Sequence, residues 1–457
     1  MPDSQSIPQA ASPPLFEDMS TTPQKDMKAV PAQSWYTLGL LTVAYALATT
    51  DRFTINILLE PIKLEFGATD AQMGILSGAS FIVFYLIFGI PMARIADRGN
   101  RSLLMAGSVT IWSIFAACTG FVTNIWMAMA SRIGLGAAES ACLPASMSLI
   151  SDLFPERRRQ LAASIFQGGM PLGMVLVGPI AGYLAHNYGW RVTLIAVGAP
   201  GLILGLLMYF TMKEPARRAA SALNGKATVV VRNSIWKDCA SLFGNPRFAL
   251  LFASQIMIGI ATSVIVVWFG VYLMRQFGIS IQTMAILIGL GMGAVMFISY
   301  LICGFITTWL VERTGNRRFT STIPGLFALA AAPLGALMLF APTLESCLAI
   351  ATLFFLLMFS SRPAGNNLVL EVVPPSQHGL AVSMIMVAIN LIGGGLGPLV
   401  VGMVSDTLSP AYGTAQSLKW ALLGAIPIEV ALSGLAFLLI SRSRKRQEAA
   451  SVKVAAL

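Results

Sequence analysis

Four charged residues lie well inside two long apolar segments in the first half of the sequence, where a charge is costly. Asp51 and Arg52 lie near the middle of the first such segment, and Arg132 and Glu139 lie in the fourth. An Asp or Arg at the centre of a membrane helix costs roughly 2.5–3.5 kcal/mol, so such residues are usually functional and usually paired. Arg132 and Glu139 are about two helical turns apart, which places them on one helix face. We therefore expect the four side chains to share one cavity near the membrane midplane.

These four residues have the chemistry of a proton-linked binding site. The group is neutral when both carboxylates are ionised, and protonation of either one leaves a net positive charge that attracts an anion. A bound anion in turn raises the affinity for the proton, which is the reciprocal linkage that coupled transport needs. We predict that Asp51 is the main protonation switch, that Glu139 contributes, and that Arg52 and Arg132 hold the substrate's charge or neutralise the carboxylates. A static ion-pair network between two helices is the alternative.

The composition indicates that membrane helices position these residues. Only 11% of the 457 residues are charged and 56% are hydrophobic, whereas a soluble domain has roughly 25% charged residues. A helix needs roughly 20 apolar residues to cross a bilayer, and lipid forces the helical form because it offers no hydrogen bonds to the backbone. Twelve segments qualify, namely 35–60, 71–96, 103–123, 126–150, 160–186, 191–212, 247–274, 281–310, 319–341, 344–371, 378–406 and 417–441.

Seven positions recur 219 residues further along the chain, which indicates two similar halves. The pairs are Asp152 and Glu371, Pro155 and Pro374, Leu161 and Leu380, Ala162 and Ala381, Ser164 and Ser383, Gly178 and Gly397, and Pro179 and Pro398. Parallel repeats of helix bundles are common among transporters. We predict an all-α membrane protein with twelve transmembrane helices in two six-helix repeats.

Arginines and lysines cluster in the loops on one side of this helix count, whereas the opposite loops, such as 60–70 and 405–419, contain fewer of them. By the positive-inside rule the basic side is cytoplasmic, and both termini lie there. We expect a disordered tail over 1–33, a first bundle over 34–212, a linker over 213–246, a second bundle over 247–441 and a basic tail over 442–457. The linker contains apolar residues at helical spacing from Ile235, which favours an interfacial helix as much as a solvated linker.

The composition also argues against several other kinds of site. The chain has two histidines and no GxxxxGK[ST] loop, so we expect neither a metal site nor ATP binding. Energy for active transport would come from a proton gradient, without a cofactor. The basic residues lie beside helix ends and do not suggest nucleic acid. We expect a monomer in the inner (plasma) membrane.

The second half offers weaker candidates for contacts with a substrate. Arg362 and, one turn on, Asn366 could add polar contacts. Trp268, Tyr272 and Phe355 could line an apolar pocket for an acyl chain, although helix packing is the more frequent role of such residues. A charged first half beside an apolar, aromatic second half suits an amphiphilic substrate.

Acidic and basic residues also alternate at the cytoplasmic helix ends of both halves. Ion pairs among them could close the cytoplasmic side of the transporter and break when that side opens. The residues concerned are Asp97, Arg98, Arg101 and Asp152 in the first half, and Glu312, Arg313, Arg317 and Glu371 in the second. Topology alone would explain the basic residues, but not their acidic partners at matched positions.

Three motifs resemble those of the major facilitator superfamily. They are Asp97-Arg98-Gly99-Asn100-Arg101 after the second segment, with Ala93 where the leading glycine usually stands, then Arg132, and then Gly178-Pro179-Ile180-Ala181-Gly182. The resemblance covers nearly the whole chain after residue 34. It implies a secondary transporter that works by alternating access, with the cytoplasmic ion pairs as a gate.

Within that superfamily the chain is most similar to the Spinster group of lipid transporters. Asp51-Arg52, the Asp-Arg-x-Asn-Arg form of the loop motif, and Gly136 to Ser140 with Glu139 carry this resemblance. It implies a membrane lipid such as a lysophospholipid or a sphingolipid-like molecule as substrate, moved with or exchanged for protons. A proton-linked carrier of small organic anions or drugs is the first alternative. A membrane receptor or scaffold without transport is the second.

Overall fold

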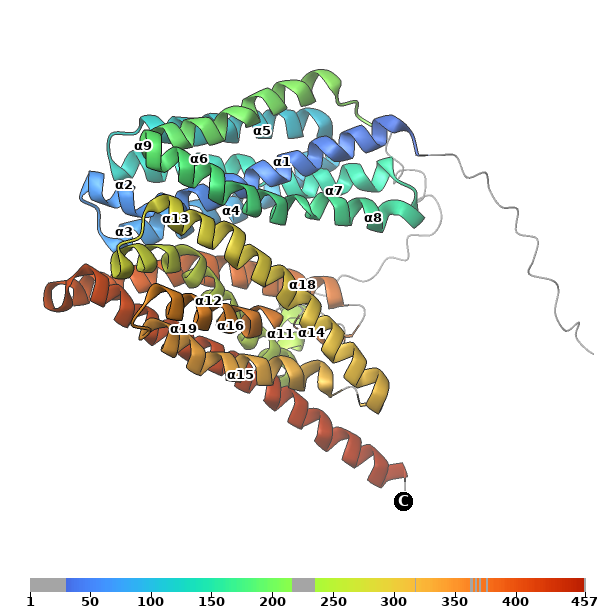
Figure 1. Cartoon of the computed structure of the whole chain (residues 1–457). Coiled ribbons are helices and arrows are strands. Elements are labelled where there is room, and N and C mark those ends of the chain that lie inside the picture. Colours follow the sequence, from blue (N-terminus) through green and yellow to red (C-terminus); the bar gives the residue numbers. More distant parts are fainter. Residues whose placement is uncertain are drawn as a thin grey trace, which may run out of the picture.

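The computed structural model describes residues 30–215 and 235–455, apart from residues 317, 362–364, 366–367, 370 and 375–376. This part of the chain is helical and contains no strand. Its helices form two bundles, one from each half of the chain (Figure 1). The expected tail before residue 30 and most of the expected linker therefore lie outside the described residues.

The first bundle contains the helices α1 to α9. Their bounds are α1 (Ala32–Ile57), α2 (Leu59–Phe66), α3 (Asp70–Gly74), the π-helix η1 (Ile75–Ala79), α4 (Ser80–Arg98), α5 (Arg101–Cys118), the short 3-10 helix η2 (Thr119–Phe121), α6 (Ile125–Glu139), α7 (Cys142–Leu153), α8 (Glu156–Gln167) and α9 (Gly169–Thr211).

The second bundle contains the helices from α12 onward, and α11 precedes it. Their bounds are α11 (Ile235–Phe243), α12 (Pro246–Phe277), α13 (Ile281–Ile286), the π-helix η3 (Leu287–Met292), α14 (Gly293–Thr314), α15 (Phe319–Leu339), α16 (Leu344–Ser360), α18 (His378–Ala388), the π-helix η5 (Ile389–Leu396) and α19 (Gly397–Ala455). Helix α11 begins where the apolar spacing predicted one. Its placement on a membrane surface stays a prediction.

Eight helical runs among the described residues are long and apolar enough to cross a membrane. Each of the twelve predicted segments overlaps helical residues, but the predicted breaks after 186 and 406 are not loops. Helices α9 and α19 continue through them, each with a single non-helical residue, Gly189 (φ 80°) and Gly413 (φ 74°). Glycine adopts positive φ without a steric penalty. A straight 43-residue helix would span about 65 Å, so Gly189 supplies the turn that a 30 Å hydrocarbon layer requires.

Three further expectations about loops and tails differ from the structure. The expected loop 405–419 is helical apart from Gly413, and the expected loop 60–70 contains α2. The expected tail after residue 441 continues α19 as far as Ala455. The charged and polar composition of these segments suggested loops. A helix, however, satisfies the hydrogen-bonding groups of the backbone equally well at a membrane surface.

The backbone repeats the internal similarity of the sequence. Gly67 and Gly278 both end a helix in the left-handed conformation, 211 positions apart. Thr69 and Ser280, also 211 apart, then cap the next helix through their side-chain oxygens. A π-helix follows in both halves, as η1 and as η3. The two halves therefore share local structure as well as sequence.

The two bundles contact each other through small residues. The contacts join α3 and η1 to α19 and η5, and α9 to α13 and η3. Gly74 packs against the backbone of Pro398 and Leu399, and Gly178 packs so closely that an added Cβ would lie 2.9 Å from Gly289 Cα. Small residues let helices approach this closely. A larger side chain at Gly178 would push the halves apart.

Candidate functional site

The structure brings the four membrane-embedded charges of the first half together. Asp51 and Arg52 lie on α1, and Arg132 and Glu139 lie on α6. Asp51, Arg132 and Glu139 are at most 5% exposed, while Arg52 is partly exposed and forms an ion pair with Glu139. Helix α6 carries Arg132 and Glu139 on one face, as their spacing predicts.

Asp51 differs from Glu139 because its carboxylate forms no hydrogen bond or ion pair with another described residue. It nevertheless lies within electrostatic range of Glu139, Arg132 and Arg52. The charge of Glu139 is compensated by a direct contact, whereas that of Asp51 is compensated only at longer range. Protonation of Asp51 would therefore break no ion pair, whereas protonation of Glu139 would disrupt its contact with Arg52.

Two aromatic residues of α4 complete this charged cluster, and the sequence did not single them out. The guanidinium carbon of Arg52 lies 4.7 Å from the ring centre of Phe81 and 5.0 Å from that of Tyr85. Arg132 lies 5.2 Å from the Phe81 ring centre. Arginine is attracted to an aromatic face electrostatically. The spacing of Phe81 and Tyr85, one helical turn apart in an apolar segment, was the available signal.

Several polar atoms of the charged cluster are buried without a hydrogen-bond partner among the described residues. These atoms are Arg52 Nε, Arg132 Nε and Glu139 Oε2. Buried polar groups are nearly always hydrogen-bonded in native proteins, so such exceptions often mark functional sites. Two unsatisfied guanidinium donors beside a protonatable carboxylate could hold an anionic or zwitterionic head group.

The aromatic candidates of the second half lie in its packed core. Trp268 and Tyr272 of α12 are fully buried, and their polar atoms donate to backbone carbonyls, Trp268 to Pro398 (3.0 Å) and Tyr272 to Leu339 (3.0 Å). Phe355 packs edge-on against Phe269 and borders a recess of about 140 Å³. This placement agrees with helix packing, the alternative that the sequence left open. The other two candidates, Arg362 and Asn366, lie outside the described residues.

A substitution at Tyr272 separates packing from substrate contact. Tyr272→Phe removes the donor to the Leu339 carbonyl and leaves that buried acceptor unpaired, which typically costs about 1–3 kcal/mol. We expect a loss of stability of this size, measured by denaturant unfolding in detergent, with unchanged substrate affinity. A fall in substrate affinity without a fall in stability would show that Tyr272 contacts the substrate.

An apolar recess of about 620 Å³ lies between α4, α5 and α6 in the first half. Phe88 and Met92 of α4, Ile111 of α5 and Ala138 of α6 are among its lining residues, and Asn100 adds a polar group at one end. The sequence analysis predicted that an apolar surface for an acyl chain would lie in the second half. This recess instead neighbours the helix that carries Arg132 and Glu139.

The predicted gate residues of the first half form contacts within that half. Arg101, 2% exposed, pairs with Asp152 (2.5 Å) and Glu214 (2.7 Å) and donates to Ser148. It thereby ties α5 to α7 and to the residues after α9. The other two predicted members, Asp97 and Arg98, are exposed at the end of α4. In this conformation Arg101 therefore stabilises one bundle, and a gating role remains a prediction.

The predicted gate residues of the second half are arranged differently. Glu312 is exposed, and Arg313 lies 5.1 Å from the ring centre of Trp309 on the same helix, α14. Glu371 accepts a hydrogen bond from Thr320 (3.3 Å). Arg317 lies outside the described residues. Because Arg317 is the counterpart of Arg101, the matched arrangement of the two halves stays a prediction.

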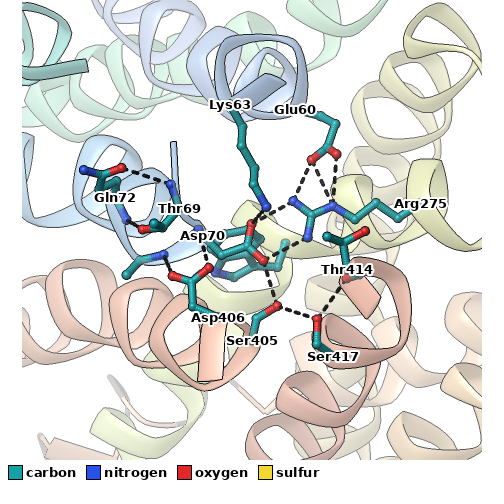
Figure 2. Close-up of polar contacts among 12 residues, drawn as sticks. Glu60, Lys63, Thr69, Asp70, Gln72, Arg275, Ser405, Asp406, Thr414 and Ser417 are labelled. Atoms are coloured by element: carbon teal, nitrogen blue, oxygen red, sulfur yellow. Dashed lines mark hydrogen bonds and ion pairs between the residues drawn. The ribbon is translucent and has the colours of Figure 1, made fainter. Parts of the chain in front are cut away.

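A second charged cluster joins the two bundles (Figure 2), at the end of the molecule where α3 lies (Figure 1). We call it the Asp70 cluster; its members are Glu60, Lys63, Asp70, Arg275, Ser405 and Asp406. Arg275 of α12 donates to both oxygens of Glu60 (2.7–3.1 Å) and of Asp70 (2.8–2.9 Å). Arg275 and Asp70 are buried, at 5% and 2% side-chain exposure.

The remaining contacts of the Asp70 cluster also cross between the halves or support the pair. Ser405 of α19 donates to Asp70 (2.7 Å), and Lys63 pairs with Asp70 within the first half (2.6 Å). Asp406 of α19 accepts from the backbone N–H groups of Asp70 (2.8 Å) and Ala71 (2.7 Å). The sequence analysis missed this cluster because its members are scattered over 347 positions, from Glu60 to Asp406.

Comparisons with known proteins agree with this fold. The family model of the Major Facilitator Superfamily matches residues 41–334 and 251–455. An MFS-type efflux pump of Mycolicibacterium smegmatis is 27% identical over 91% of this chain and 94% of its own. The sphingosine-1-phosphate transporter SPNS2 of Danio rerio is 26% identical over 88% of this chain and 82% of its own.

A solved structure shows the same fold. The crystal structure of a bacterial homolog of the human lysosomal transporter Spinster, inward-facing and unoccupied, matches with a TM-score of 0.80 at 24% identity, over 91% of this chain and 98% of that one. The apolar helical runs make the chain an integral, multi-pass membrane protein. The resemblance found in the motifs is confirmed: this chain belongs to the Major Facilitator Superfamily and is a transporter of its Spinster group.

Proposed function

We propose that this transporter moves an amphiphilic anionic or zwitterionic lipid, such as a lysophospholipid or a sphingolipid-like molecule, and couples that movement to protons. The observation that supports this proposal best is the cluster of Asp51, Arg52, Arg132 and Glu139 in the first bundle, in which two carboxylates and Arg132 are buried and Arg52 is partly exposed. A head group with negative charge complements the two arginines. A proton on Asp51 would leave the cluster positive and so favour anion binding.

The lipid class rests on two supports. One relative is named as a transporter of sphingosine 1-phosphate, and several others as Spinster homologues. The apolar recess between α4, α5 and α6 lies beside the helix with Arg132 and Glu139, and its size and lining suit an acyl chain. A polar head group and an apolar tail would then both find matching surfaces in the first half.

The proposed mechanism is alternating access by a protein that crosses the inner (plasma) membrane twelve times as a monomer, with both termini in the cytoplasm. The twelve crossings follow if α9 and α19 each cross twice by turning at Gly189 and Gly413. The bundles touch through α3, η1 and α9 near the Asp70 cluster. With the basic loops cytoplasmic, the Asp70 cluster is external and this conformation is closed to the outside.

The function is tested by uptake into proteoliposomes with and without an imposed pH gradient. A labelled lysophospholipid is compared with labelled small organic anions, using empty liposomes as the control. We expect saturable lysophospholipid uptake that responds to the gradient. Uptake of organic anions alone would reject the lipid substrate and favour a drug-type carrier, a possibility raised by the relative named as an efflux pump. No transport of either class by folded protein would favour a receptor or scaffold.

A further inference from the structure

We propose that Asn56 is a specificity-determining residue of this transporter, which accepts a hydrogen bond from a hydroxyl group that the lipid carries beside its phosphate. The inference rests on the proposed function, because it names the chemical group by which one amphiphilic lipid is told from another. Asn56 lies on α1, four residues after Arg52. Residues four apart share one helix face and are about 6 Å apart along the helix axis. Asn56 is therefore one turn further into the protein than the arginine that would bind the head group.

The carboxamide oxygen of Asn56 has no partner inside the protein. Its Oδ1 atom is buried and accepts no hydrogen bond from another described residue. A buried acceptor without a donor is costly, whereas an apolar side chain of the same shape avoids this cost. Leucine would therefore serve the packing of α1 at this position at least as well. The retained carboxamide points to a donor that arrives with the substrate.

A small cavity of about 20 Å³ lies beside this carboxamide. Its walls come from both halves, namely from α1 and α9 of the first half and from α12, α13 and η3 of the second. The other described residues that line it are apolar, for example Phe53, Val177 and Ile288. Among these lining residues, Asn56 is thus the one whose side chain offers a hydrogen-bonding oxygen or nitrogen.

The size and the lining of this cavity suit a single hydroxyl group. About 10–15 Å³ of such space is enough for one water molecule, so the cavity can take a hydroxyl but not a phosphate. A water molecule there would meet one polar side chain, whereas buried waters typically form about three hydrogen bonds. Such a water is poorly held. A substrate hydroxyl that reproduces its bond to Asn56 therefore displaces it at little cost.

The position of this hydroxyl subsite selects a class of lipid. With the phosphate at Arg52 and Arg132, the hydroxyl must lie only a few bonds from the phosphate. Lysophosphatidic acid has a free hydroxyl on the glycerol carbon next to the one that carries the phosphate. A diacyl lipid has an ester at that carbon, which cannot donate a hydrogen bond and is too large for the cavity. We therefore expect a preference for single-chain lipids with a free hydroxyl beside the phosphate.

Uptake of two labelled lipids into proteoliposomes tests the hydroxyl subsite. One is lysophosphatidic acid, and the other is its 2-deoxy analogue, which has the same acyl chain and phosphate but lacks the hydroxyl. For the parent protein we expect kcat/KM to be about tenfold higher for lysophosphatidic acid, because the analogue leaves the acceptor of Asn56 unpaired. In Asn56→Leu the two lipids should have equal kcat/KM.

The ratio of the two kcat/KM values is the readout, because a folding defect or an altered movement of the halves changes both values by the same factor. Asn187→Leu is the matched control. Asn187 is exposed on α9 and donates to Tyr183 of the same helix, so this variant should keep the preference. If Asn56→Leu does not fold, Asn56→Ala replaces it, with the same expected result.

Two results would overturn the hydroxyl subsite and leave the proposed function standing. They are equal kcat/KM for both lipids in the parent protein, and an unchanged preference in folded Asn56→Leu or Asn56→Ala. A third result, no saturable uptake of either lipid by the folded parent, would reject the proposed function and the subsite together.

Discussion

Asp51→Asn is expected to reduce uptake driven by a pH gradient to the level of empty liposomes, while the folded protein persists. The substitution keeps the size of the side chain but removes the group that binds the proton. Asp51 is buried and has no direct ionic partner among the described residues, so its loss leaves no cation suddenly unpaired. Folding is checked by size-exclusion chromatography and thermal unfolding, and transport by uptake with an inside-alkaline gradient.

Glu345→Gln is the control for this variant. Glu345 is an exposed carboxylate at the start of α16, outside every candidate site, so the same change from carboxylate to amide there should leave the response to the gradient intact. If Asp51→Asn still shows full gradient-driven uptake, Asp51 is not the protonation switch. The pair of Asp51 and Glu139 would then have to be tested together.

Arg101→Gln is expected to destabilise the first bundle by about 3 kcal/mol. The variant leaves Asp152 and Glu214 without the guanidinium that they share, and Asp152 is only 7% exposed. Breaking a buried ion pair by removing one partner typically costs about 3–5 kcal/mol, and the partial exposure of Glu214, 24%, favours the lower end. Denaturant unfolding in detergent measures the change.

Arg98→Gln provides the comparison for Arg101→Gln. Arg98 is exposed three residues earlier in the same motif, and exposed substitutions usually change stability by less than about 0.5 kcal/mol. Equal effects of the two variants would show that the motif acts through its net charge. A normal stability of Arg101→Gln together with altered transport would support the gating role that the sequence suggested.

Most of the fold could be predicted from the sequence, because helices that are buried in a membrane need long apolar segments. Apolar segments of spanning length, the 219-residue repeat and the loop motif predicted the helices, the halves and the superfamily. The sequence could not show that the predicted break near residue 189 is a single glycine in an otherwise continuous helix. Composition identifies turns by their polar residues, whereas Gly189 and Gly413 turn by their φ angles alone.

The residues of the candidate site could also be predicted only in part from the sequence. Charges inside apolar segments are rare and costly, so Asp51 and Arg132 could be found without a structure. Phe81 lies among many apolar residues, and its spacing from Tyr85 does not by itself show that both arginines face its ring. Arg275 and Asp70 are 205 positions apart, and only the packing of the two halves brings them together. Contacts between distant residues were therefore the part that sequence patterns could not supply.

The most direct test of the central claim is whether the substrate itself moves protons. Proteoliposomes containing the protein and a trapped pH-sensitive dye are given a lysophospholipid gradient without any imposed pH gradient. The account predicts a proton flux that starts with the lipid and is absent in Asp51→Asn. Lipid transport by the parent without any accompanying proton flux would contradict the coupling that the buried cluster of Asp51, Arg52, Arg132 and Glu139 is proposed to perform.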